Sequence, residues 1–171
     1  MRRSCPMCVL LLLLAGSDIA APAIAADSQR QQDVRQAGAE VMPFSLDQTQ
    51  HVFEKNDAGG VQRVLLRGTT NEEQRQMIRA HLRQIAESFA ARDFDKPSHI
   101  HGDNMPGLAQ LKAAKAGELE VIYSELPQGA QIIYRSAAPQ IIAAIHRWFD
   151  AQLADHGNDA SSATPAPSHQ P

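Results

Sequence analysis

The stretch GGVQRVLLRGTTNEEQRQMIRAHLRQI, from Gly59 to Ile85, combines a strand pattern with the start of an amphipathic helix. The glycine pair and the following VQRVLLR are typical of a strand that leaves a tight turn. Thr70 followed three residues later by Glu73 is a capping-box pattern, which predicts that a helix begins there. The apolar positions of this helix recur at helical spacing and are expected to be buried: Ile78, Leu82, Ile85 and Phe89.

A second stretch, QGAQIIYRSAAPQIIAAIHRWF from Gln128 to Phe149, repeats this order and places His146 where the first stretch has His81. Each unit is preceded by another strand, within Met42 to Lys55 and within Glu118 to Leu126, through the turns NDAGG and PQG. The sequence therefore predicts an α+β fold. We expect a two-layer sandwich, with an antiparallel sheet from two hairpins and two main helices on one face, and a ββα duplication. The apolar positions expected in the core of the last helix are Ile142, Ile145, Phe149 and Leu153.

The two ends of the chain differ in composition from its middle. Residues 1–26 have a short basic start, an apolar run too short to span a bilayer and a small-residue end, which is typical of a secretory signal peptide. Residues 27–40 and 157–171 are polar or rich in Ser, Ala and Pro, and are expected to be unstructured. The prediction is one domain over residues 41–156, periplasmic or secreted, with no membrane span after signal cleavage.

Charge and cysteine content restrict the possible partners. Both cysteines, Cys5 and Cys8, lie in the predicted signal peptide, so the remaining chain offers neither a disulfide nor a thiolate ligand. Without residues 1–26 the chain has 14 basic and 18 acidic residues, a net charge of about −4. This mild acidity argues against nucleic acid as a partner.

The stretch KPSHIHGDNMPGL contains the clearest candidate metal ligands. His99 and His101 are two residues apart, and in an extended segment they would project to the same side. Met105 offers a soft thioether, and histidine with methionine but without cysteine favours copper, with zinc as the alternative. Asp103 and Asp95 are expected to orient the imidazoles as outer carboxylates.

Two further histidines are candidates to complete such a site. His81 and His146 lie at the edges of the apolar stripes of their helices, in equivalent positions of the two units. A buried histidine loses its charge unless it has a partner, so each is expected to face an acceptor or a metal ion. The competing interpretation is that the histidine-rich stretch is a polar loop and that these two are core residues.

Other histidines and the single tryptophan receive structural interpretations. His156 stands in the last turn of the final helix, where a histidine favours the negative end of the helix dipole. His51 is expected to face solvent or lie between sheet and loop. Trp148 is either a core residue or part of a surface for a protein partner.

The sequence contains no nucleophile elbow, Walker loop, dinucleotide fingerprint or HExxH motif. We therefore expect a non-catalytic protein that binds copper or zinc in the periplasm. The first alternative is a metal-free module that binds another protein of the cell envelope. The second is a small histidine-dependent enzyme.

The pattern HVF…GGVQ…IRAHL…IHG..MPGL, followed by Y..LP.GA.I.Y and IHRWFDAQL.DHG, resembles a family of small secreted bacterial proteins. The resemblance covers nearly all of Met42 to Gly157. Members are mostly uncharacterised, and some carry the label aspartate carbamoyltransferase. The residues do not support that label, because such an enzyme needs two domains and a Ser-Thr-Arg-Thr phosphate-binding loop, which this sequence lacks. The resemblance implies a discrete secreted domain.

Overall fold

The computed structural model describes residues 21–68 and 71–163. The predicted signal peptide, residues 1–26, lies mostly outside them. The helices and strands, in chain order, are α1 (Ala21–Val41), β1 (Thr49–Asn56), β2 (Gly59–Leu66), α2 (Glu72–Ala90), α3 (Asp95–His101), α4 (Leu108–Lys112), β3 (Glu120–Leu126), β4 (Gly129–Arg135), α5 (Pro139–His156), the 3₁₀ turn η1 (Gly157–Asp159) and β5 (Ala160–Ser162).

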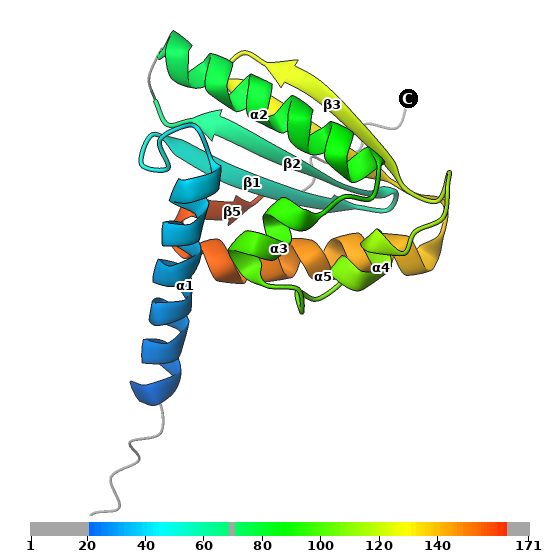
Figure 1. The fold of residues 1–171 in the computed structure, drawn as a ribbon, viewed down its shortest axis with the longest axis horizontal. Helices are drawn as coiled ribbons and strands as arrows, with labels where there is room; N and C mark the ends of the chain where they lie inside the picture. Colours follow the sequence, from blue (N-terminus) through cyan, green and yellow to red (C-terminus); the bar gives the residue numbers. More distant parts are fainter. Residues whose placement is uncertain (1–20, 69–70, 164–171) are drawn as a thin grey trace, which may run out of the picture.

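The strands form one five-stranded sheet in the order β3-β4-β2-β1-β5 (Figure 1). The pairs β1–β2 and β3–β4 are antiparallel hairpins, and β2 pairs antiparallel with β4 at the centre. The predicted α+β fold with two hairpins is confirmed. The sheet is mixed rather than antiparallel, because β5 pairs parallel with β1. That strand comes from residues 157–171, which the sequence had predicted to be unstructured; residues 164–171 lie outside the described chain.

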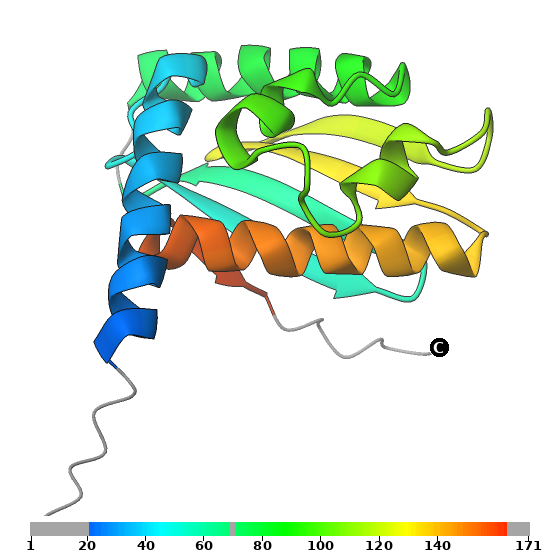
Figure 2. The same ribbon diagram turned by 60° about the horizontal axis from the view of Figure 1, so that its bottom comes forward.

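The long helices α2 and α5 cover the same face of the sheet (Figure 2). Tyr134 of β4 lies between them, with its ring centroid 6.4 Å from Phe89 of α2 and 5.5 Å from Trp148 of α5. Each helix crosses to the hairpin of the other unit: α2 packs mainly over β3 and β4, and α5 over β2 and β1. The apolar side chains between these layers form a single core.

Helix α2 begins one residue later than the capping-box pattern predicted. Asn71 is the N-cap, and its side-chain oxygen accepts a hydrogen bond of 3.2 Å from the backbone N–H of Gln74. Asn is among the strongest N-cap residues because its short side chain reaches the unpaired N–H groups of the first turn. Thr70, the predicted cap, lies outside the described residues.

The buried side of α5 is rotated from the predicted one. Ile145 and Phe149 are buried as expected, whereas Ile142 and Leu153 are only partly buried. Trp148 is completely buried, with 0% of its surface exposed, so it belongs to the core and not to a surface for a partner. The side of α5 that faces the sheet is therefore the one that carries Trp148.

Residues 27–40 are not unstructured, because they form most of α1. This helix packs against α3 and α5 and not on the sheet (Figures 1 and 2). Ion pairs attach it to the end of the chain: Arg30 to Asp155 at 2.6 Å, and Arg35 to Asp159. Val34 adds one buried apolar side chain. Asp155 and Asp159 are more than 100 residues away from these arginines, so the local composition of residues 27–40 carries no sign of them.

Candidate functional site

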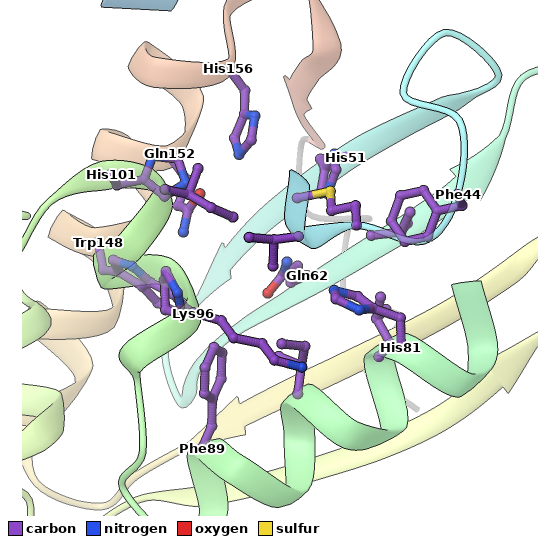
Figure 3. Close-up of a pocket in the computed structure, with 17 residues that line it drawn as sticks. Phe44, His51, Gln62, His81, Phe89, Lys96, His101, Trp148, Gln152 and His156 are labelled. Atoms are coloured by element: carbon purple, nitrogen blue, oxygen red, sulfur yellow. The ribbon is translucent and has the colours of Figure 1, made fainter. Parts of the chain in front are cut away.

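Four histidines from four different elements line one small, partly open cavity of about 50 Å³, here called the histidine chamber (Figure 3). His51 comes from β1, His81 from α2, His101 from the end of α3 and His156 from the end of α5. Their residue exposures are 4% for His51, 9% for His81 and 6% for His101, and His156 is partly exposed. In Figure 3, His156 and His81 extend from α5 and α2 toward the same space.

The register of β1 explains why His51 points into the chamber. Side chains alternate along a strand, so His51 shares its face with Thr49 and Phe53, which are both buried. Val52, between them, lies on the opposite face. His51 therefore faces the helices, and the expectation that it faces solvent was wrong.

Three of the imidazoles form a continuous row. The rings of His51 and His156 are stacked, with centroids 5.0 Å apart and planes 8° from parallel. The ring of His101 meets that of His156 edge-on, also at 5.0 Å between centroids. His81 is in edge contact with Phe44 at 5.6 Å instead. The chamber thus offers three adjacent imidazoles and a fourth nearby.

The histidines of the chamber are neutral at neutral pH. Burial lowers the pKa of His51 to about 4, against a smaller opposing effect of Asp159. Burial also lowers the pKa of His81 to about 4, with a further contribution from Lys96. The pKa of His156 falls well below its usual value because the ring is buried beside His51 and His101. A neutral imidazole keeps a nitrogen lone pair, which is the form that binds metals.

A carboxylate and an arginine fix the orientation of His101. Its Nδ1 donates to Asp155 at 2.8 Å, while Arg30 of α1 donates to the two oxygens of that carboxylate at 2.6 and 3.0 Å. Although burial opposes it, these hydrogen bonds hold the pKa of Asp155 below its ordinary value. Burial nevertheless keeps the pKa of His101 lowered. The bond to Nδ1 leaves Nε2 on the side of the ring away from Asp155.

His101 is shared by the chamber and a neighbouring groove. It lines this second, more open groove of about 370 Å³, together with Arg30, Asp103, Met105 and Asp155 among others. Two of the predicted site residues, Asp103 and Met105, therefore lie in this groove and not in the chamber. Met105 is buried in the core, and Asp103 is exposed with its carboxylate 3.5 Å from Lys112.

His99 and His101 do not share one side. The segment from Asp95 to His101 is the helix α3, and two residues along a helix turn through about 200°. His101 is consequently buried and His99 exposed. Asp95 is an exposed residue of the first turn of α3, away from the chamber lining. The premise of an extended HxH pair was wrong because the chain between Arg92 and Gly102 forms this extra helix.

His146 has a structural partner. Its Nε2 lies 3.0 Å from the carbonyl oxygen of Asn56 and 2.8 Å from that of Gly59, so it donates to the β1–β2 turn. His81 and His146 occupy corresponding positions in the two units but different surroundings. Of the predicted ligands, only His81 and His101 line the chamber.

Replacing His146 by Leu is expected to lower the free energy of unfolding by about 1–3 kcal/mol, because two carbonyl groups of the turn lose their donor. The measurement is urea unfolding followed by circular dichroism. The control is His99→Leu at an exposed position of α3, which should change the value by less than about 0.5 kcal/mol. Equal effects of the two substitutions would contradict the structural role of His146.

The chain matches no family model, no curated protein and no solved structure. Among the described residues, no helix is long and apolar enough to cross a membrane.

Proposed function

We propose that the protein binds one transition-metal ion, copper or zinc, in the histidine chamber and holds it without acting on it chemically. The observation that carries the proposal is the convergence of four neutral histidines from β1, α2, α3 and α5 on one small cavity. Histidine nitrogen is a common ligand of both ions. The role we infer is sequestration, delivery or sensing of the ion in the periplasm.

The size of the chamber supports an ion over an organic ligand. Pockets for small organic molecules usually enclose about 300–1,000 Å³. The chamber encloses about 50 Å³, between walls that include Phe44, Phe89 and Trp148. A space of this size suits an ion with its protein ligands better than a substrate of metabolite size.

The contact between Asp155 and His101 also supports a metal site. In metal centres a carboxylate commonly accepts a hydrogen bond from one ring nitrogen of a histidine and directs the other nitrogen to the ion. Asp155 stands in that position, with His101 Nδ1 at 2.8 Å. Its own carboxylate is held by Arg30, so the orientation of the ring is fixed from two sides.

Binding requires the imidazoles to turn. Over residues 21–68 and 71–163, no three side chains of His, Cys, Asp or Glu already form a group that could hold an ion. The stacked rings of His51 and His156 must rotate, because a metal ion lies in the plane of each imidazole that binds it.

Titration of the chain, produced without a polyhistidine tag, tests the proposal. We expect one equivalent of metal to bind with a Kd below about 1 µM, followed by competition with a chromophoric chelator. His101→Asn and His156→Asn should each weaken binding by about 100-fold or more, since loss of an outer partner alone costs 10- to 100-fold. The matched control is His99→Asn, an exposed histidine of the same helix as His101, which should bind like the wild type.

Two results would contradict the proposal: no binding in this range, or an equal loss in the control variant. Circular dichroism of each metal-free variant would show whether it is folded. Thermal shift with and without metal would give a second measure of binding, since a ligand of the folded state raises its stability.

The contact between His101 and Asp155 supports one alternative function, a small enzyme with His101 as general base, because a carboxylate orients the base in such sites. No Ser, Thr or Cys is among the residues that line the chamber, so a nucleophile would have to come from the substrate or from water.

A second alternative is a module that binds another protein. It is supported by the sheet face without helices, where Val52, Leu65 and Ile133 are partly exposed. Pull-down without added metal would favour this second alternative.

A further inference from the structure

We infer that the ion of the histidine chamber is Cu(I), in preference to Zn(II) or Cu(II). This inference rests on the proposed function, and it concerns the charge and softness of the ion. It is drawn from which side chains line the chamber and which do not.

The lining carries no negative charge. None of its residues is Asp or Glu, and its only charged side chain is the cation of Lys96, whose Nζ donates to Gln84 at 2.9 Å. Two carboxylates stand behind the lining: Asp155, behind His101, is paired with Arg30, and Asp159, which acts on His51, is paired with Arg35. The cost of moving an ion from water into a buried site rises with the square of its charge. Neutral ligands without a balancing carboxylate therefore favour a monovalent cation over a divalent one.

The donor atoms are soft or borderline. Besides the imidazoles, the lining includes the thioether of Met42, which directly follows α1 and is partly buried against the core. Thioether sulfur selects Cu(I) and is a poor ligand for Zn(II). No cysteine lies in the described chain, so a zinc site with thiolates is not available there.

The number of adjacent donors also fits Cu(I). Structural zinc requires four ligands in a tetrahedron. The row of His51, His156 and His101, with 5.0 Å between successive ring centroids, supplies three, while His81 packs separately against Phe44. Cu(I) accepts two or three ligands.

The test compares the affinities of the untagged chain for Cu(I), under anaerobic reducing conditions, and for Zn(II). We expect the Kd for Cu(I) to be at least about 100-fold lower than that for Zn(II). Ag(I), a monovalent soft ion without redox chemistry, should compete with Cu(I) for the same single site. The fluorescence of Trp148, the only tryptophan of the chain and part of the chamber lining, reports binding at this place.

Met42→Leu removes the sulfur and keeps a similar side-chain volume. It should weaken Cu(I) binding by about 10-fold and leave Zn(II) binding unchanged, because only the softer ion uses the thioether. The matched control is Met105→Leu, since Met105 lines the groove and not the chamber. That variant should bind both ions like the wild type.

The possible outcomes separate this inference from the proposed function. Zn(II) bound as tightly as Cu(I), with loss in His101→Asn, would overturn the preference for Cu(I) and leave a metal site. Unchanged Cu(I) affinity in Met42→Leu would overturn the role of the thioether. Failure of both ions to bind would overturn the proposed function, and this inference with it.

Discussion

Lowering the pH from about 6.5 to about 4 is expected to destabilise the metal-free protein by several kcal/mol. The cause is the set of buried histidines of the chamber. Burial lowers the pKa of His51 to about 4 and that of His81 to about 4. An unfolded chain exposes the same side chains to water, where their pKa is near 6.5.

The direction follows from which state binds protons. Above pH 6.5 the histidines are neutral in both states, and the stability is fully present. Between pH 6.5 and 4 the unfolded chain takes up protons that His51 and His81 in the folded chain do not, so the free energy of unfolding falls. Below about pH 4 both states are protonated and the loss is complete, at about 3 kcal/mol for each of the two residues.

Urea unfolding at a series of pH values between 7.5 and 4 measures this loss. Carboxylates also begin to protonate near pH 4, so the diagnostic quantity is the difference between the wild type and His81→Gln. The variant lacks one proton-binding group. In the steep part of the range, its free energy of unfolding should therefore fall by about 1.4 kcal/mol less per pH unit than that of the wild type. Identical slopes for the two proteins would refute the assignment of the proton uptake to the chamber.

Replacing Trp148 by Ala is expected to lower the free energy of unfolding by about 3–5 kcal/mol. The indole is completely buried, with 0% exposure. Its ring centroid lies 5.7 Å from that of Phe89, 6.0 Å from Phe94 and 5.5 Å from Tyr134. The substitution removes the centre of this aromatic cluster and leaves a cavity between α2, α5 and the sheet.

Circular dichroism during denaturant unfolding is the suitable measurement, because the variant has no tryptophan fluorescence. Trp148→Phe serves as the control, since it keeps an aromatic ring in the cluster and should lose clearly less stability than the alanine variant. A loss below about 1 kcal/mol in Trp148→Ala would show that the surrounding side chains collapse into the space, contrary to the packing described here.

The two hairpins and the two long helices were predictable from the sequence because their signals are local. Glycine-rich turns and apolar residues at helical or alternating spacing lie within one element, as in NDAGG and in the stripe from Ile78 to Phe89. Helix α1 was not predictable in this way, since its ion pairs join Arg30 and Arg35 to residues near the end of the chain. The parallel pairing of β5 with β1 likewise joins segments that are far apart in the sequence.

The candidate site was only partly predictable. His81 and His101 were identified from their spacing. His51 was expected to face solvent or to lie between sheet and loop, although the large Phe53 two positions later indicates the buried face of the strand. His156 was assigned to the helix dipole, which explains a histidine at that position without reference to any neighbour. Which histidines share a cavity depends on how four separate elements pack.

The crossing of α2 and α5 to opposite hairpins means that the two halves of the chain are interlocked. Residues 49–90 supply His51 and His81. The helix that packs on their hairpin, β1–β2, is α5 of the other half, which also supplies His156. Neither half encloses a core by itself. The fragments, separated near Gly102, are expected to be unfolded alone and to assemble only with each other, and the four histidines of the chamber then come together only in the assembled pair. An ion bound in the chamber would hold the two halves together, and its binding free energy would add to the stability of the assembled protein.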